Sequence, residues 1–176
     1  MKIYVARHGQ TLWNVQNRVC GRTDVELTKE GIEQAKKLAQ KVKKYAIDFI
    51  IASPLKRAQQ TSQIVAEENG LEIFTDERLI EQNYGIYEGV ERTNGDFLAN
   101  KRQFAYRYPE GESMMQVAHR TYSLIEEIKE KYPNQNVLLI CHGGVSRLIN
   151  TYFKDITNDD FFHYELENAK LMEYEV

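Results

Sequence analysis

Short runs of apolar residues alternate along the chain with segments in which apolar residues recur at every third or fourth position. The apolar runs lie at Lys2–Ala6, Phe49–Ala52, Leu71–Thr75 and Val137–Cys141. Runs of this length, bounded by polar residues or glycine, are typical of buried β-strands. The last run is apolar throughout, which indicates a strand covered on both faces.

The periodic segments predict helices with one face toward the core. They run from a Thr28 cap to about Lys44, from about Leu55 to Gly70, from a Ser113 cap to about Tyr132, and over 143–153. Gly70 is expected to end its helix in a left-handed conformation. In the first helix we expect the buried face to comprise Ile32, Ala35, Leu38, Ala39 and Val42.

Three segments fall outside this pattern. A long polar loop spans 7–24, and residues 76–112 are irregular and too long for a simple connection, which predicts a small lid or short helices. Residues 164–176 are interpreted as two short strands around Glu167-Asn168. Strands that alternate with helices predict one domain over 1–176, with a three-layer α/β/α fold, a largely parallel sheet and a C-terminal antiparallel edge.

The charge balance narrows the class of partner. Lysine and arginine number 23 against 26 aspartate and glutamate residues, which gives a net charge of −3. A phosphate backbone requires a basic surface, so nucleic acid is not expected as the partner. No run is long enough to span a membrane. Two cysteines without a CxxC pattern predict neither a disulfide framework nor a zinc site, and the chain is expected to be cytoplasmic.

Cationic and imidazole side chains follow three of the predicted strands. Arg7 and His8 come after the first strand, Arg57 after the second and His142 after the fourth. In a parallel sheet these strand ends share one edge, where open α/β folds bind ligands. Two guanidinium groups and two imidazoles at one edge fit a phosphate ester of a small molecule.

The chemistry of such a site assigns different roles to the two histidines. His8 is the better nucleophile, because neighbouring arginines keep its imidazole neutral, and His142 can donate to phosphoryl oxygens. The leaving alkoxide needs a proton from a carboxylic acid beyond the third strand. Glu77, Glu81 and Glu88 are all available there, and their spacing does not choose among them. The other two histidines, His119 and His163, are interpreted as structural.

Taken together, these motifs resemble the histidine phosphatase superfamily, which includes the cofactor-dependent phosphoglycerate mutases. The matching blocks are Arg7-His8-Gly9 with Asn14, residues 17–31, Ser53 to Thr61, Leu79 to Gly89, Gly111-Glu112-Ser113, and Cys141-His142-Gly143-Gly144. The resemblance implies a phosphoglycerate mutase-like fold without a metal or other cofactor.

The resemblance also assigns roles to individual residues. It implies that His8 becomes phosphorylated, that Arg7, Arg57 and His142 complete the phosphate pocket, and that Glu81 is the proton donor. It further implies a substrate-binding set, which comprises Asn14, Cys20, Gly21, Tyr84 and Gly143.

Two departures from the mutases favour a phosphatase. Mutases usually carry His-Gly-Asn where this chain has His142-Gly143-Gly144, and they have a longer insertion bearing an arginine pair for the substrate carboxylate. Here residues 90–110 are short, although Lys101-Arg102 or Arg107 could imitate that pair. A short lid admits water to the phosphohistidine. We therefore expect a phosphomonoesterase of the histidine acid phosphatase type. The alternatives are a cofactor-dependent phosphoglycerate mutase and a non-catalytic phosphate-binding module.

Overall fold

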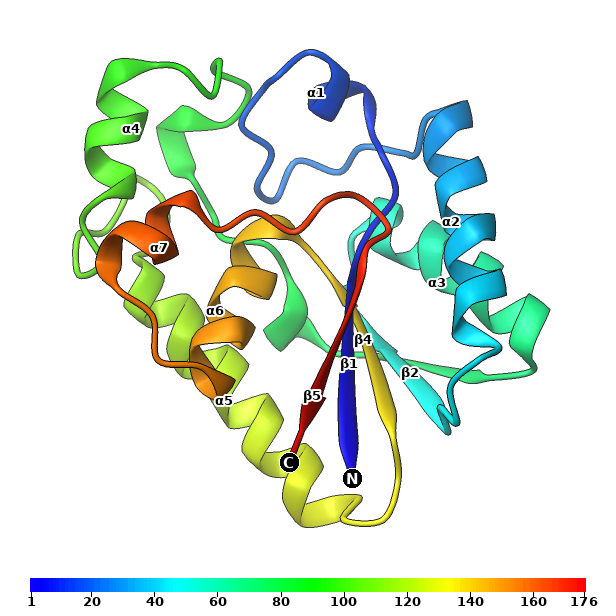
Figure 1. Ribbon diagram of the computed structural model, residues 1–176. Helices are drawn as coiled ribbons and strands as arrows, with labels where there is room; N and C mark the ends of the chain where they lie inside the picture. Colours follow the sequence, from blue (N-terminus) through cyan, green and yellow to red (C-terminus); the bar gives the residue numbers. More distant parts are fainter.

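A five-stranded sheet with the order β3-β2-β4-β1-β5 forms the centre of the computed structural model, which describes all 176 residues (Figure 1). Its strands are β1 (Lys2–Arg7), β2 (Phe49–Ala52), β3 (Glu72–Thr75), β4 (Val137–Cys141) and β5 (Leu171–Glu175). Only β5 is antiparallel to its neighbour, β1. The largely parallel sheet with a C-terminal antiparallel edge is therefore confirmed.

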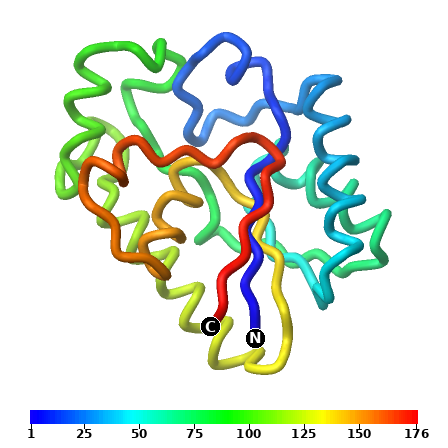
Figure 2. The backbone as a smooth tube through the Cα atoms, viewed as in Figure 1, coloured from blue at the N-terminus to red at the C-terminus, as the bar shows by residue number.

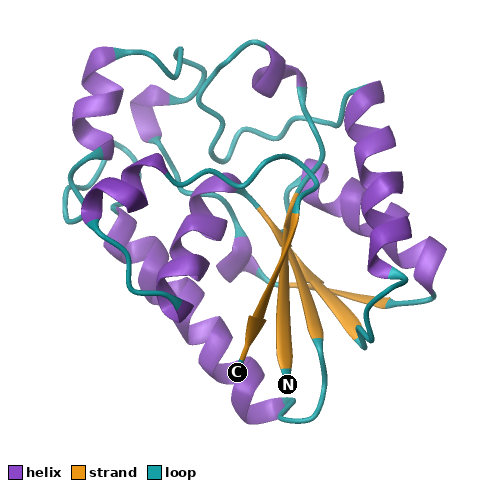
Figure 3. Ribbon diagram, viewed as in Figure 1, coloured by secondary structure: helices purple, strands orange, loops and turns teal.

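Helices cover both faces of the sheet (Figure 3). The helices α2 (Lys29–Val42) and α3 (Lys56–Asn69) lie on one face, and α5 (Met114–Lys131) and α6 (Gly143–Phe153) on the other. Alternation along β1 explains this, because successive side chains of a strand point to opposite faces. Tyr4 packs among residues of α2 and α3, whereas Ile3 and Val5 pack among those of α5 and α6. The predicted three-layer α/β/α fold is confirmed.

The predicted helix ends agree with the structure. The side chains of Thr28 and Ser113 cap α2 and α5, and Gly70 follows α3 with φ of 66°. One predicted core position, Ile32, is wrong, because 36% of this residue is exposed. The buried face of α2 instead includes Gly31, against which a neighbouring loop packs closely.

Two irregular segments lie side by side above the carboxyl ends of the strands (Figure 2). The loop after β1 contains the short helix α1 (Leu12–Val15), and residues 76–112 contain η1 (Glu77–Leu79), η2 (Gly85–Tyr87) and α4 (Gly95–Lys101). A β-bridge between Arg18 and Glu91 joins the two segments. Residues 76–112 therefore form short helices of their own, as the sequence predicts.

The C-terminal region differs from its prediction. The sequence indicates two short strands in 164–176, but after the helix α7 (Asn158–His163) the structure has only a loop and the single strand β5 there. The loop bonds to the end of β1: Ala169 N–H donates to Arg7 O at 3.0 Å, and Asn168 Nδ2 donates to His8 O at 2.9 Å. These long-range contacts replace the local pairing that a hairpin would need.

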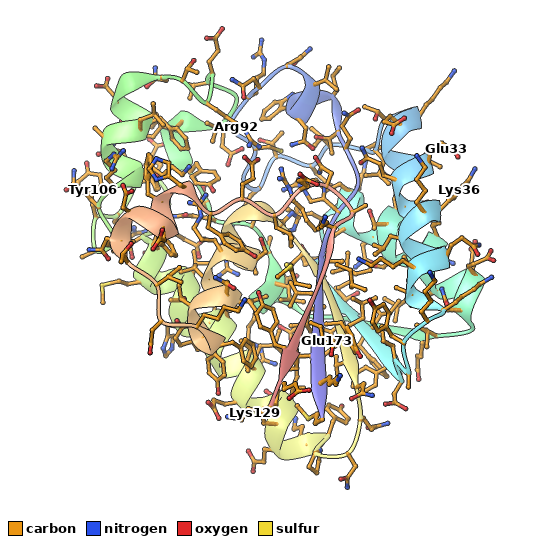
Figure 4. All side chains as sticks on the ribbon, in the orientation of Figure 1. Glu33, Lys36, Arg92, Tyr106, Lys129 and Glu173 are labelled. Carbon is orange, nitrogen blue, oxygen red and sulfur yellow. The ribbon has the colours of Figure 1, made fainter.

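Two of the three aromatic residues between α4 and α5 pack against other rings. Phe104 packs edge-on against Phe161, with ring centroids 5.0 Å apart, and Tyr108 is buried in a cluster with Phe97. Tyr106 projects from the surface (Figure 4). No helix of this chain has the length and apolar character that crossing a bilayer requires.

Candidate active site

The structure brings the four side chains at the strand ends together. Arg7 ends β1 and His8 follows it, Arg57 lies in the first turn of α3, and His142 separates β4 from α6. All four are at most 5% exposed. The Nε atom of Arg57 lies 3.2 Å from His8 Nε2 and 3.2 Å from His142 Nδ1. Parallel pairing of β1, β2 and β4 produces this meeting, because it places their carboxyl ends at one edge.

The ring of His8 is held in one orientation. Its Nδ1 lies 2.7 Å from the carbonyl oxygen of Gly9. A carbonyl only accepts, so Nδ1 carries the hydrogen and Nε2 presents a lone pair to the site. Burial, followed by the charges of Arg57 and Arg7, holds the pKa of His8 well below its ordinary value. The imidazole is therefore neutral at neutral pH, with its nucleophilic nitrogen facing the cations.

Arg57 is fixed by backbone oxygens on the far side from the imidazoles. Its Nη2 donates to Gly21 O at 2.7 Å and its Nη1 to Thr23 O at 2.9 Å. No carboxylate lies within 4 Å of it, so its charge remains available to a ligand. Gly21, which the resemblance assigns to substrate binding, thus lies behind Arg57 and holds it.

Arg7 has a buried donor without a partner. Its Nη1 donates to Leu166 O at 2.8 Å and reaches Glu165 at 3.4 Å, but its buried Nε bonds to nothing. A buried N–H without an acceptor costs free energy that a ligand oxygen can recover. Gly143 lies directly beside this guanidinium, since a Cβ there would be 3.6 Å from Arg7 Cζ. An oxyanion placed here would meet both the guanidinium and the N-terminus of α6.

His142 has a partner that sequence reasoning did not identify. Its Nε2 lies 2.7 Å from Ser53 Oγ, and Ser53 also accepts a bond from Leu55 N–H at 3.4 Å. Arg57 Nε can only donate, so Nδ1 accepts from it and Nε2 carries the hydrogen, which it donates to Ser53 Oγ. Ser53 directly follows β2, so its place at the same sheet edge as Arg57 was the signal available in the sequence.

Among the three candidate acids, only Glu81 lines the cavity beside His8. It is 4% exposed, and its carboxylate accepts from Gly144 N–H at 2.9 Å and Gln82 N–H at 2.8 Å. Glu77 is exposed on η1. Glu88 accepts bonds from the loop after β1, which it ties to residues 76–112. The position of Glu81 on the cavity wall therefore distinguishes it from Glu77 and Glu88, a choice that the spacing of the three residues in the sequence left open.

A cavity of about 390 Å³ opens above Arg7 and His8. Four of the five residues that the resemblance assigns to substrate binding line it: Asn14, Cys20, Tyr84 and Gly143. Burial raises the pKa of the Cys20 thiol to about 11, so this residue is a neutral part of the wall.

The outer part of the cavity contains residues that the sequence did not identify as a group. Arg92, Arg147 and His163 line it together with Lys101. The other two cations considered as a carboxylate-binding pair point elsewhere. Arg102 stacks on the ring of Phe162, 3.7 Å from its centroid, and Arg107 Nε donates to Gly111 O at 2.9 Å.

The arrangement suits chemistry on a phosphate ester. A neutral imidazole can attack phosphorus, two guanidinium groups and a second imidazole can neutralise the equatorial oxygens, and a carboxyl group lies on the cavity wall. No group of three or more His, Cys, Asp or Glu side chains in the structure could hold a metal ion.

Comparison with known proteins agrees with this geometry. The family profile described as "Histidine phosphatase superfamily (branch 1)" matches residues 3–176. The "Probable phosphoglycerate mutase GpmB" of Yersinia pestis (strain Pestoides F) is 37% identical over 150 residues, which cover 81% of this chain and 70% of that protein. The protein of the same name from Yersinia pseudotuberculosis serotype O:3 (strain YPIII) matches equally well.

Solved structures with the same architecture include named phosphatases. A mycobacterial glucosyl-3-phosphoglycerate phosphatase in complex with VO3 has a TM-score of 0.88 at 28% identity, covering 98% of this chain and 91% of that one. The alpha-ribazole phosphatase from Shigella flexneri has a TM-score of 0.86 at 25% identity, covering 100% and 91%.

Proposed function

Because the chain belongs to the histidine phosphatase superfamily (branch 1), we propose that it hydrolyses the phosphomonoester of a small metabolite through a phosphohistidine at His8. It would thus be a phosphomonoesterase of the histidine acid phosphatase type. The observation that carries this proposal is the position of His8 Nε2, 3.2 Å from the guanidinium of Arg57 and beside the cavity. Its lone pair faces the place where the cations would hold a phosphoryl group.

In the first step of the proposed reaction, His8 Nε2 attacks phosphorus and the bond to the ester oxygen breaks. Arg7, Arg57 and His142 stabilise the charge on the equatorial oxygens as it grows in the transition state. Glu81 gives its proton to the departing alkoxide, which leaves as an alcohol.

In the second step, water attacks the phosphohistidine and the bond between nitrogen and phosphorus breaks. Glu81, now a carboxylate, takes the proton of the attacking water, which restores the acid for the next cycle. Inorganic phosphate leaves and His8 is neutral again. Residues 76–112 act as the lid in this proposal, because they carry Glu81 and much of the outer cavity wall.

The experiment that tests this proposal is phosphate release from para-nitrophenyl phosphate by the wild-type chain and by His8→Ala. We expect the wild type to turn over in the presence of EDTA and the variant to lose activity by about a thousandfold or more. His119→Ala, at an exposed position of α5, is the matched control and keeps its activity. Near-normal turnover by His8→Ala would contradict the proposal. Phosphate binding without turnover by the wild type would support a non-catalytic binding module instead.

A second candidate function is a cofactor-dependent phosphoglycerate mutase. It is favoured by the 37% identity to proteins named as probable phosphoglycerate mutases. The two functions differ in the acceptor of the phosphoryl group, which is water for a phosphatase and a second hydroxyl for a mutase. Incubation with 3-phosphoglycerate, with and without 2,3-bisphosphoglycerate, separates them. A phosphatase releases inorganic phosphate in both cases, whereas a mutase forms 2-phosphoglycerate and depends on the bisphosphate.

A further inference from the structure

Glu88 takes no part in the proposed reaction, yet three donors of the loop after β1 converge on its carboxylate. We propose that Glu88 is a positioning residue, which holds residues 21–23 so that their carbonyl oxygens fix the guanidinium of Arg57 in the phosphate pocket. The lid, residues 76–112, then sets the geometry of the pocket as well as access to it. This inference rests on the proposed function, because that function assigns Arg57 to the phosphoryl group.

The carboxylate of Glu88 is half-buried and uses both of its oxygens. Its Oε2 accepts from Gly21 N–H at 3.1 Å and from the hydroxyl of Thr23 at 2.8 Å. Its Oε1 accepts from Arg22 N–H at 3.1 Å. A carboxylate accepts at both oxygens and donates from neither, whereas an amide turns an NH2 group toward one of its partners. Three donors on consecutive residues therefore match a carboxylate and not an amide.

Gly21 allows the loop and the lid to approach closely. It is buried, and a Cβ built on it would lie 2.1 Å from Glu88 Oε1 and 2.3 Å from Gln82 O, so a side chain there would push the lid away. The guanidinium of Arg22 provides a second connection, because it pairs with Glu112 of the lid at 3.0 Å. A shift of the lid therefore displaces Gly21 and Arg22.

The same loop residues that donate to Glu88 accept from Arg57. Gly21 O accepts from Arg57 Nη2 at 2.7 Å, and Thr23 O accepts from Arg57 Nη1 at 2.9 Å. The loop lies between the lid and α3, which carries Arg57 (Figure 1). Gly21 and Thr23 each bond to both side chains, so the position of the carboxylate sets the position of the two carbonyl oxygens.

These two acceptors determine how Arg57 faces the histidines. With both Nη atoms bonded to the loop, the Nε atom lies 3.2 Å from His8 Nε2 and 3.2 Å from His142 Nδ1. Arg57 is only 1% exposed, so bulk water cannot replace the acceptors. A displacement of the two carbonyl oxygens would therefore turn the guanidinium away from the phosphoryl oxygens that it is proposed to stabilise.

The backbone around Arg57 is held by other residues. Asp24 Oδ1 accepts from Lys56 N–H at 2.8 Å at the start of α3, and the hydroxyl of Thr61 donates to Arg57 O at 2.7 Å. Neither bond involves Glu88. We therefore expect the loss of a bond to Glu88 to move the guanidinium of Arg57 and to leave α3 in place.

The first measurement compares Glu88→Gln with the wild type on para-nitrophenyl phosphate. The amide keeps the size of the side chain, but at least one of the three bonds is lost. We expect kcat/KM to fall by about tenfold. Most of this loss should be in kcat, because the charge that Arg57 stabilises grows in the transition state. Glu91→Gln is the matched control: it makes the same charge change in the lid, where the exposed Glu91 bonds only to Thr93 Oγ1, at 3.5 Å. We expect it to keep the wild-type kinetics.

A double-mutant cycle tests whether Glu88 acts through Arg57. Arg57→Lys keeps the positive charge but lacks the planar fork that reaches both carbonyl oxygens. In that background Glu88→Gln should lower kcat/KM by less than about twofold, because the geometry that Glu88 maintains is already lost. A second cycle uses Thr23→Val, which removes one donor to Glu88 but keeps Thr23 O, and it decides the question if Arg57→Lys is inactive. Combined with Glu88→Gln, it should add less than its own loss in the wild type.

The outcomes separate this inference from the proposed function. If the wild type hydrolyses para-nitrophenyl phosphate and Glu88→Gln, folded by circular dichroism, matches it, the role of Glu88 is contradicted and the phosphatase proposal stands. The same holds if Glu88→Gln costs about tenfold in both backgrounds, since it would then act independently of Arg57. If Glu88→Gln does not fold, unchanged kinetics of Thr23→Val contradict the role. If the wild type turns over no phosphate ester, the proposed function itself fails.

Discussion

Gly144 lies against the carboxylate of Glu81. Its N–H donates to Glu81 Oε2 at 2.9 Å, and a Cβ built at Gly144 would lie 2.6 Å from Oε1 and 3.1 Å from the Tyr84 hydroxyl. The first turn of α6 thus fixes the proposed proton donor by its backbone, and it leaves no room for a side chain. This contact connects the His142-Gly143-Gly144 motif to Glu81, which lies in a different segment of the chain.

The role of Glu81 as proton donor predicts a dependence on the leaving group. Glu81→Gln removes the proton but keeps the shape of the side chain. We expect kcat/KM, which covers only the steps up to departure of the alkoxide, to fall by about a hundredfold or more for an alkyl phosphate, whose alkoxide needs the proton. For para-nitrophenyl phosphate, whose phenolate leaves readily, we expect a loss of less than about tenfold. Glu77→Gln on η1 is the control and changes neither rate. An equal loss for both esters would argue against the role.

Gly144→Ala tests the same acid through its neighbour. Overpacking costs about 1–3 kcal/mol, and the higher helix propensity of alanine offsets up to about 1 kcal/mol of this, so the fold is retained. Displacement of the Glu81 carboxylate should lower kcat for alkyl phosphates by about tenfold. Gly95→Ala is the matched control, because nothing lies within 4 Å of a Cβ at that helical glycine. Unchanged turnover by Gly144→Ala would show that the carboxylate position is not needed.

Ser53 is predicted to act through His142. Ser53→Ala removes the hydroxyl 2.7 Å from His142 Nε2, and with it the hydrogen bond that holds the imidazole ring in place. We expect kcat to fall by about tenfold with a smaller change in KM. Ser62→Ala is the control, because Ser62 is equally buried but donates to Ala58 O within α3. Similar kinetics for both variants would contradict a positioning role for Ser53.

The buried histidines predict how stability depends on pH. Burial first, and then the charges of nearby arginines, holds the pKa of His8 and of His142 well below the ordinary value of about 6.5. Below that pH the unfolded chain binds protons that the folded chain does not. The contribution of the two neutral histidines to the free energy of unfolding is therefore fully present above about pH 6.5. It falls as the pH decreases toward the folded pKa, by up to about 1.4 kcal/mol per pH unit for each histidine.

Urea denaturation of the ligand-free protein at a series of pH values measures this slope. The window from about pH 6.5 to about pH 5 lies above the ordinary carboxyl pKa values, so carboxylates contribute little there. His8→Gln should show a smaller slope than the wild type. A free energy of unfolding that stays constant or rises as the pH falls through this window would contradict the neutral, buried state of the two imidazoles.

Most of the fold could be predicted because its signals are local. The apolar runs that form β1, β2 and β4 and the periodic stripes of α2 and α5 are visible in the sequence. Once the sheet is parallel, Arg7, Arg57 and His142 must meet at one edge. That is why the inner site could be assembled from residues far apart in the chain.

The remainder depends on long-range contacts that no local pattern records. The loop after α7 is set by bonds to Arg7 and His8 more than 150 residues away, so two strands were expected where one forms. The directions in which the side chains of Lys101 and Arg147 point depend on how α4 and α6 pack around the cavity. The periodicity of apolar residues does not predict these directions. Gly144 shows the same limit, because its need for glycine follows from a contact with Glu81, 63 residues away.

The covalent intermediate at His8 gives the most direct test of the proposed mechanism. The wild-type protein is mixed with substrate, quenched rapidly in base, digested and examined by mass spectrometry for phosphorylated peptides. We predict one acid-labile phosphoryl group on the peptide that contains His8, attached at Nε2, and none in His8→Ala. Full turnover without any phosphorylated His8 peptide, or the same modification on another residue in His8→Ala, would contradict it.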